Sequence, residues 1–299
     1  MNECKKIVIT GASGFLGSHL VEKLKDDKRY KVYALTSRPH ELESRINSEN
    51  VEYLHKDSIN NTAEIIEGAM VVNCAYPRNS SGADVADGLK YIRSIFETAV
   101  GSKASAIINI SSQSVYSQKR TKAATEDSTV SLESSYAVGK YSVELLLESI
   151  CKGSNTAYTN LRMASLIGPG FDQRIVNRLI KNAIDTGSIT VKKNQQRFGF
   201  FDVEDAVNGI CLILESNPLI WKPVYNLGRD EAYSLIEIAE YIKKTLRESY
   251  GIRITVNVID GDEAGNSQLN CDMFSQDFGF ESEYTLHKSI SIIAKHFIQ

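Results

Sequence analysis

The chain has 299 residues, 42% hydrophobic and 24% charged, a balance typical of a globular protein with a substantial core. Its formal net charge of −3 gives no reason to expect nucleic acid or an anionic membrane as a partner. The five cysteines are scattered and show no CxxC spacing, which favours reduced thiols over disulfides or a zinc site. No membrane-length apolar run and no signal-peptide core is present, so a cytoplasmic protein is expected.

Strands and helices are predicted to alternate through the first half of the chain. Apolar, β-branched runs predict strands at 6–10, 30–37, 51–57, 69–75, 104–112 and 157–168. Helical spacing of apolar residues predicts helices at 15–27, 63–68, 85–101 and 134–150. This alternation indicates an α/β fold of the Rossmann type, with a doubly wound parallel sheet.

The second half has a looser rhythm, which predicts a smaller, discontinuous C-terminal substrate lobe. Helices are expected at 174–186, 203–215, 234–247 and 285–297, and strands at 188–192, 223–228 and 253–259. The dinucleotide-binding domain is predicted to comprise 1–168 plus about 193–216. The substrate-binding lobe is predicted to comprise about 169–192 plus 217–299.

A glycine-rich turn, "TGASGFLGSHL", joins the first predicted strand to the first helix. Gly11, Gly14 and Gly17 permit a tight turn, close approach of a pyrophosphate, and close packing of helix on strand. The helix N-terminus then faces the phosphates. The sequence therefore predicts a dinucleotide site whose turn comprises Gly11, Ser13, Gly14, Phe15, Leu16 and Gly17.

The end of the second predicted strand bears on which dinucleotide binds. NAD-binding proteins commonly place a carboxylate there for the ribose 2′-hydroxyl. Here Thr36 and Ser37 occupy that place and Arg38 follows, a set that suits a 2′-phosphate. NADP(H) is therefore favoured over NAD(H), unless Arg38 is only a solvated loop residue.

Tyr136 and Lys140 lie four residues apart in "YAVGK", so a helix places them on the same face. A nearby ammonium favours the phenolate form of tyrosine, which can exchange a proton with a substrate oxygen during hydride transfer. The motif follows a strand that ends in "SS", and the Ser112 hydroxyl there can polarise the same oxygen. The alternative for Ser112 is a strand-end residue that caps local backbone.

These motifs together resemble the extended short-chain dehydrogenase/reductase family, which comprises sugar-nucleotide epimerases, dehydratases and ketoreductases. The resemblance runs nearly end to end. It rests on "TGASGFLG" at 10–17, "VVNCA" at 71–75, "SSQSVY" at 111–116, "YAVGK" at 136–140, "LRMASLIGPG" at 161–170, "RFGFFDVEDAV" at 197–207, "VYNLG" at 224–228 and "DFGF" at 277–280.

The resemblance implies a role for each matching residue. Ser112 matches the catalytic serine, Tyr136 the proton donor or acceptor, and Lys140 the lysine that holds the nicotinamide ribose. A homodimer and a small-molecule sugar-nucleotide substrate are also implied. Further cofactor contacts are implied at Asp57, Ser58, Cys74 and Ala75, with Asp57 matching an adenine-contacting aspartate.

Departures from the family pattern narrow the chemistry. Family 4,6-dehydratases carry an Asp-Glu pair after the catalytic residue, whereas this chain has Gln113 and Ser114. Neither side chain can serve as a carboxylate acid or base, so elimination of water is not expected. Asp202 and Asp205 are expected to cap the following helix and to interact with its dipole.

The substrate contacts are expected at Arg78, Ser112, Gln113, Ser165 and Arg197. Ser165 stands in place of the family asparagine that contacts the nucleotide-sugar diphosphate, and Arg197 matches the family arginine that clamps it. The alternatives are a solvated loop arginine for Arg78 and, for Arg197, a surface arginine that caps the next helix.

The resulting hypothesis is an NADP(H)-preferring ketoreductase that reduces a 4-keto-6-deoxy sugar nucleotide. The close alternative is a nucleotide-sugar 4-epimerase that uses the same three residues with hydride leaving and returning. An alternative of another class is a non-catalytic dinucleotide-binding sensor, since a fold does not determine a function.

Overall fold

The computed structural model describes residues 4–61, 63–77 and 81–299, which fall into two compact units. Unit 1 comprises Met1–Val115, Ser131–Arg162 and Ile210–Tyr225. Unit 2 comprises Tyr116–Val130, Met163–Gly209 and Asn226–Gln299. The domain boundaries expected from the sequence stay a prediction.

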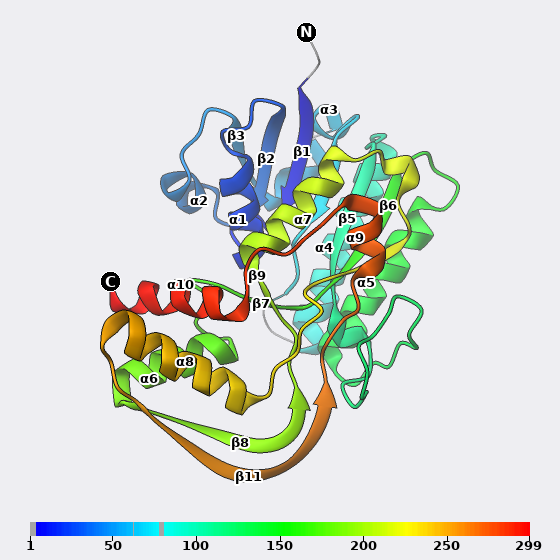
Figure 1. Ribbon diagram of the computed structural model, residues 1–299. Helices are drawn as coiled ribbons and strands as arrows, with labels where there is room; N and C mark the ends of the chain where they lie inside the picture. The colour runs from blue at the N-terminus through cyan, green and yellow to red at the C-terminus, as the bar shows by residue number, and fades with distance from the viewer. Residues whose placement is uncertain (1–3, 62, 78–80) are drawn as a thin grey trace. The chain divides into compact units, whose positions relative to one another are not determined.

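A seven-stranded sheet has the order β10-β6-β5-β4-β1-β2-β3 (Figure 1). The pairs β1–β2, β1–β4, β2–β3 and β4–β5 are parallel. The predicted doubly wound α/β fold is therefore confirmed. The strands are β1 Lys5–Thr10, β2 Tyr30–Thr36, β3 Val51–His55, β4 Met70–Asn73, β5 Ala106–Ser112, β6 Ala157–Met163 and β10 Val224–Leu227.

Helices cover this sheet because its strands are apolar on both faces. Val8, Val71 and Ile107 pack in one buried cluster with Phe96 and Leu147 from two helices. The helices and helical turns between the strands are α1 Phe15–Leu24, α2 Pro39–Arg45, η1 Lys56–Asn61, α3 Ala63–Ile66, α4 Gly82–Gly101, η2 Gln113–Val115, α5 Ser135–Cys151, α7 Val203–Glu215 and η3 Pro218–Ile220.

Buried polar side chains form a ladder across four neighbouring strands. Thr10 Oγ1 donates to Asn73 Oδ1 at 2.7 Å, and Asn73 Nδ2 donates to Asn109 Oδ1 at 2.9 Å. Asn109 Nδ2 then donates to Asn160 Oδ1 at 2.7 Å. Each residue is at most 2% exposed, so the ladder satisfies groups that would otherwise be costly to bury.

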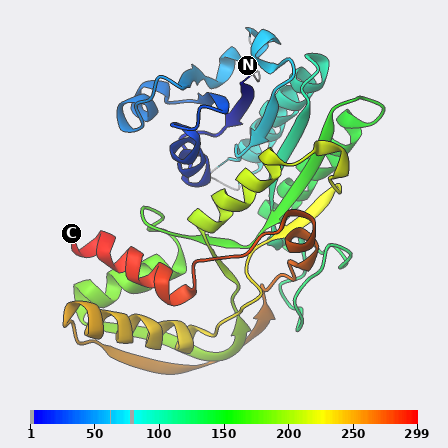
Figure 2. The ribbon, with the colours of Figure 1, turned by 45° about the horizontal axis from the view of Figure 1, so that its top comes forward.

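In unit 2, α6 and α8 lie against a two-stranded parallel ribbon, and α10 packs on these two helices. Figure 2 shows β8 and β11 side by side, and α8 contacts both. Ile180, Ile242 and Ile290, one from each helix, lie in a single buried cluster. The elements of this unit are β7 Ser165–Ile167, α6 Ile175–Thr186, β8 Ser188–Arg197, β9 Phe200–Asp202, α8 Leu235–Tyr250, β11 Thr255–Asn266, α9 Asp272–Phe278 and α10 Leu286–Ile298.

β8 and β11 both run further than the strands predicted at 188–192 and 253–259. Their extensions contain polar residues such as Gln195 and Gln196, which carry no hydrophobic strand signal. Pairing between the two strands maintains the extended backbone, with a register shift between Asp260 and Ala264. Among the helices of the described residues, none is long and apolar enough to cross a membrane.

Candidate active site

The glycine turn after β1 brings backbone against backbone in unit 1. Gly11 has φ +66°, and a Cβ there would lie 2.7 Å from the backbone nitrogen of Ala75. A Cβ on Gly17 would lie 2.4 Å from the carbonyl oxygen of Gly11. The turn therefore admits no side chain at either position.

The N-terminus of α1 has the character of an anion site. Its N-cap is Gly14, which is extended at φ −72° and has no side chain to occupy the first N–H groups of the helix. Leu16 is buried and packs this first turn against the core. A side-chain-free turn that opens a helix fits a dinucleotide pyrophosphate.

The end of β2 lies beside this turn. Thr36 is 3% exposed, and its hydroxyl donates to Ser13 Oγ at 2.6 Å. The Arg38 backbone N–H donates to Thr36 Oγ1 at 3.2 Å, and its guanidinium pairs with Glu41 at 2.9 Å. Arg38 thus has a carboxylate partner, although an exposed pair of this kind is weak and exchanges readily. Ser37 is exposed next to it.

Asp57 and Ser58 follow β3 in the helical turn η1. The Asp57 carboxylate is exposed and lies 3.6 Å from Lys56 Nζ. Lys56 Nζ in turn lies 5.4 Å from the ring centroid of Tyr91 on α4. Burial, with a smaller contribution from the Asp57 charge, raises the pKa of Tyr91. The predicted adenine-side residue is therefore solvent-accessible beside an aromatic ring.

Ser112 is the last residue of β5 and accepts two local hydrogen bonds. Ser114 donates to Ser112 Oγ from its backbone N–H at 3.2 Å and from its hydroxyl at 3.0 Å. Ser112 Oγ therefore caps local backbone, as the alternative interpretation expected, and still carries a proton to donate. Gln113, the next residue, is buried at 7% exposure.

Tyr136 and Lys140 lie on the first turns of α5. The helix begins where the Ser134 side chain accepts the Ala137 backbone N–H at 3.1 Å. Lys140 is 6% exposed, and its Nζ donates to the carbonyl oxygen of Ile110 at 2.8 Å. The same nitrogen lies 5.9 Å from the centroid of the Tyr136 ring. The structure thus brings these two side chains together beside the end of β5, which α5 contacts.

Tyr76 is a third member of this group, which the sequence patterns did not single out. It follows β4, and its ring centroid lies 4.3 Å from Lys140 Nζ. Its ring meets the Tyr136 ring edge-on, with the centroids 5.2 Å apart. Only the order of the strands brings residue 76 to this helix, so no local pattern signals it.

A buried ion pair lies one further turn along the same face of α5. Glu144 and Arg162 pair at 2.7 Å, with side chains 4% and 6% exposed. The hydroxyl of Ser111 on β5 also donates to Glu144. The stripe Tyr136, Lys140, Glu144 at four-residue spacing is a signal that sequence reasoning missed.

The residues predicted to contact the substrate do not all lie in unit 1. Arg78 lies outside the described residues. Ser165 on β7 and Arg197 on β8 belong to unit 2. Arg197 pairs with Glu237 at 2.7 Å and donates to the Ala232 carbonyl oxygen at 2.6 Å. Glu237 is part of the capping box of α8, so Arg197 supports the start of α8 and not the next helix in the chain, α7, that its alternative interpretation named.

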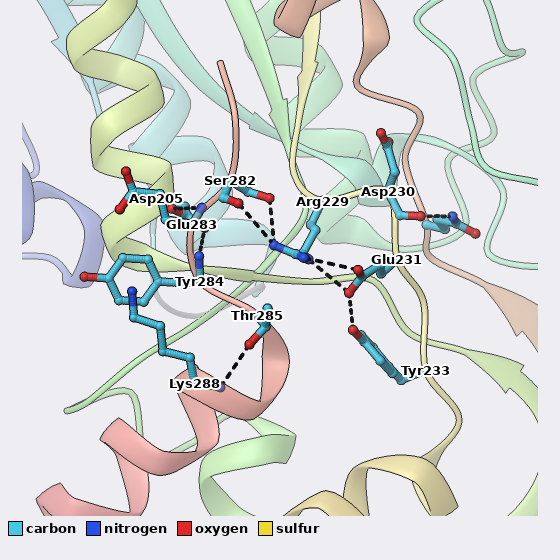
Figure 3. Close-up of polar contacts among 11 residues, drawn as sticks. Asp205, Arg229, Asp230, Glu231, Tyr233, Ser282, Glu283, Tyr284, Thr285 and Lys288 are labelled. Carbon is cyan, nitrogen blue, oxygen red and sulfur yellow. Dashed lines mark hydrogen bonds and ion pairs between the residues drawn. The ribbon is translucent and has the colours of Figure 1, made fainter. Parts of the chain in front are cut away.

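Asp205 binds a distant segment of unit 2 instead of acting only as a helix cap. Its carboxylate accepts the backbone N–H groups of Glu283 and Tyr284 at 3.0 and 2.9 Å (Figure 3). Asp202 does accept the Glu204 N–H at 2.9 Å, as a cap would, and burial raises its pKa. The expectation of helix capping is therefore incomplete for Asp205, because a carboxylate can accept two backbone donors from elsewhere in the chain.

Arg229 holds the same segment from the other side (Figure 3). Its guanidinium donates to the Ser282 hydroxyl at 2.8 Å and pairs with Glu231 at 3.0 Å. The hydrogen bond from Arg229 holds the pKa of Glu231 below its usual value of 4.5. These contacts hold the segment that leads into α10 within unit 2.

Comparison with known proteins gives this site its context. Residues 7–228 match the model of the NAD dependent epimerase/dehydratase family. The chain belongs to this family. Among curated epimerase/dehydratase relatives, an uncharacterized UDP-glucose epimerase of Bacillus subtilis is 26% identical over 80% of this chain and 81% of its own. UDP-glucuronic acid decarboxylase 3 of Arabidopsis thaliana is 22% identical over 98% of this chain and 89% of its own.

A solved structure of the same fold is UDP-glucuronic acid 4-epimerase from Bacillus cereus in complex with UDP-glucuronic acid and NAD. It superposes with a TM-score of 0.82 at 22% identity, covering 98% of this chain and 99% of that chain. Membership in the NAD dependent epimerase/dehydratase family confirms the resemblance stated from the sequence and the expectation of an enzyme.

Proposed function

We propose that the protein is an NAD-dependent 4-epimerase of a nucleotide sugar. The observation that carries this proposal is the grouping of Tyr136 and Lys140 at the end of β5, where Ser112 has a proton to donate. Gln113 and Ser114 beside it supply no carboxylate for elimination. Such a set suits hydride transfer with proton transfer at one oxygen.

The residues divide the chemistry among them. NAD, held by the glycine turn after β1 and by the end of β2, would supply a reversible hydride acceptor for C4 of the sugar. Tyr136 takes the proton of the C4 hydroxyl and later gives it back. Ser112 donates a hydrogen bond to the same oxygen, and Lys140 places its ammonium group beside the Tyr136 ring.

The relatives favour this reading over reduction of a 4-keto-6-deoxy sugar. They include a UDP-glucose epimerase and a UDP-glucuronic acid 4-epimerase. The ketoreductase first favoured from the sequence therefore becomes the second candidate. We propose UDP-sugars as substrates, with Ser165 and Arg197 serving the diphosphate after Arg197 leaves Glu237.

We also propose NAD as the cofactor, in place of the NADP(H) preferred from the sequence. The family description names NAD. Arg38, the residue that would meet a 2′-phosphate, pairs with Glu41. A carboxylate at this place repels a phosphate and suits a ribose 2′-hydroxyl.

A homodimer through α5 completes the proposal. Val138 and Leu145 on α5 are 46% and 48% exposed and lie seven residues apart, which places them on one face. Exposed large apolar side chains arranged in this way are typical of helix–helix interfaces.

The deciding experiment treats purified protein with UDP-glucose, UDP-glucuronic acid and UDP-N-acetylglucosamine and follows the C4 epimers by NMR. Denatured protein is assayed for retained nucleotide by mass spectrometry. Retained NAD with epimer formation supports the proposal. If the protein instead oxidises added NADPH in the presence of a 4-keto-6-deoxy sugar nucleotide and forms no epimer, it is a ketoreductase.

Replacing Tyr136 by Phe tests the catalytic assignment. Because the phenol carries the proton, kcat should fall by about 10²–10⁴-fold while NAD is still retained. Tyr158→Phe on β6 is the matched control and should keep normal turnover. A Tyr136→Phe variant with near-normal turnover contradicts the assignment.

A further inference from the structure

We propose that Tyr76 is a positioning residue for the Tyr136–Lys140 pair, and that Gly139 is the feature of α5 that admits it. The inference rests on the proposed function in that it assigns Tyr136 and Lys140 to proton transfer. It goes further because it assigns a role to Tyr76, which follows β4 and lies outside α5.

The Tyr76 ring forms one wall around the Lys140 ammonium. Its centroid lies 4.3 Å from Lys140 Nζ, closer than the 5.9 Å between that nitrogen and the Tyr136 ring. The carbonyl oxygen of Ile110 accepts a hydrogen bond from the same nitrogen at 2.8 Å. Because a buried ammonium needs compensation, the aromatic face and the carbonyl together hold it in place.

Tyr76 also contacts Tyr136 directly. The two rings meet edge-on at an interplanar angle of 80°, with the centroids 5.2 Å apart. The Tyr76 hydroxyl donates to the backbone carbonyl oxygen of Tyr136 at 3.3 Å. One side chain therefore touches both members of the pair and constrains their separation.

Gly139 makes room for this arrangement. A Cβ at position 139 would lie 2.1 Å from the Tyr76 hydroxyl oxygen and 3.2 Å from the Tyr76 Cζ. It would also lie 3.3 Å from Val85 Cγ1 on α4. Glycine inside a helix costs about 1 kcal/mol relative to alanine, so its presence here is explained by the ring it accommodates.

The groups around the ammonium leave its charge available to Tyr136. Burial, with Tyr136 adding to it, raises the pKa of Tyr76 to about 12, so Tyr76 stays protonated. Burial likewise raises the pKa of the Cys74 thiol to about 12, against the opposing effect of Lys140. On α5 itself, the Glu144 carboxylate is engaged by Ser111 and Arg162.

The test compares kcat and KM of Tyr76→Leu and Tyr76→Phe with those of the NAD-loaded wild type. Tyr76→Leu removes the aromatic wall, so kcat should fall about 5- to 10-fold with little change in KM. Tyr76→Phe keeps the ring and should stay within about twofold of wild type.

Gly139→Ala supplies a reciprocal test. It should displace the Tyr76 ring and reproduce the kcat loss of Tyr76→Leu, with little change in KM. Adding Tyr76→Phe removes the hydroxyl oxygen that would lie 2.1 Å from the new Cβ, so the double variant should recover most of the lost kcat. Gly101→Ala, at a helical glycine whose Cβ would meet no atom within 4 Å, is the control.

Thermal unfolding of the same variants distinguishes the role of Tyr76 from the proposed epimerase function. The effects of Gly139→Ala and Tyr76→Phe on the melting temperature should be non-additive whether or not the protein is an epimerase. If that coupling is present and no epimerisation occurs, the proposed function fails alone. If wild type epimerises while Tyr76→Leu keeps the wild-type kcat, or if Tyr76→Phe does not rescue Gly139→Ala, the role of Tyr76 is overturned.

Discussion

Backbone conformation and packing both exclude a Cβ atom at Gly11. Its φ of +66° lies in the region where an L side chain costs roughly 1–2 kcal/mol, and its missing Cβ would fall 2.7 Å from the Ala75 backbone nitrogen. The role of Gly11, Gly14 and Gly17 could be predicted from their spacing in the sequence, because that spacing reflects local turn geometry. The contact with Ala75 could not be predicted, since it depends on β4 lying next to β1.

Gly11→Ala should therefore both destabilise the protein and weaken NAD binding. Gly68→Ala is the matched control, because Gly68 has φ +70° and its Cβ would meet no atom within 4 Å. In both variants the strained backbone should lower the free energy of unfolding by about 1–2 kcal/mol. In Gly11→Ala, overpacking should lower it by about 1–3 kcal/mol more. Urea unfolding and calorimetric titration with NAD measure the two effects. Equal unfolding free energies and equal NAD affinities for the two variants would contradict this account.

The contacts of α5 explain why the stripe of Tyr136, Lys140 and Glu144 lies against β5. Lys140 bonds the Ile110 carbonyl, and one turn later Glu144 accepts from Ser111, so consecutive residues of β5 hold consecutive turns of α5. Arg162 on β6 completes the second link. A buried pair of this kind adds little net stability, yet removing one partner is costly because the other charge stays buried.

Glu144→Gln should lower the free energy of unfolding by about 3–5 kcal/mol, since Arg162 is left without its counter-charge. Asp185→Asn is the surface control, because it removes the exposed Lys181–Asp185 pair at 2.8 Å and should cost at most about 0.5 kcal/mol. The double variant Glu144→Leu with Arg162→Met should recover most of the loss in urea unfolding. A Glu144→Gln variant as stable as Asp185→Asn would refute this role of the pair.

At the scale of the whole molecule, the proposed functions are divided between the two units. Unit 1 carries the predicted cofactor residues and the Ser112, Tyr136 and Lys140 set. Ser165 and Arg197, the described candidates for the substrate diphosphate, belong to unit 2. The exposed apolar face of α5 assigns the proposed dimer contact to unit 1.

Introducing Glu at Val138 and Leu145 together should convert the dimer into a monomer, because two charges would be buried at the contact. The control is Leu219→Glu, since Leu219 is 87% exposed and lies on η3 away from α5 in the sequence. Sedimentation velocity gives the mass of each variant. A monomeric wild type, or a double variant that stays dimeric, rules out this interface.

The amino-acid sequence by itself determined the α/β alternation, the glycine turn and the placement of Tyr136 and Lys140 on one helical face. Each of these follows from backbone geometry over a few neighbouring residues, so a local pattern suffices. The tertiary structure alone decided that Tyr76 meets Gly139 and Lys140, that the asparagine ladder crosses the sheet, and that Asp205 binds residues 283–284. These contacts join residues far apart in the chain, and they exist only once the order of the strands and the packing of the helices bring them together.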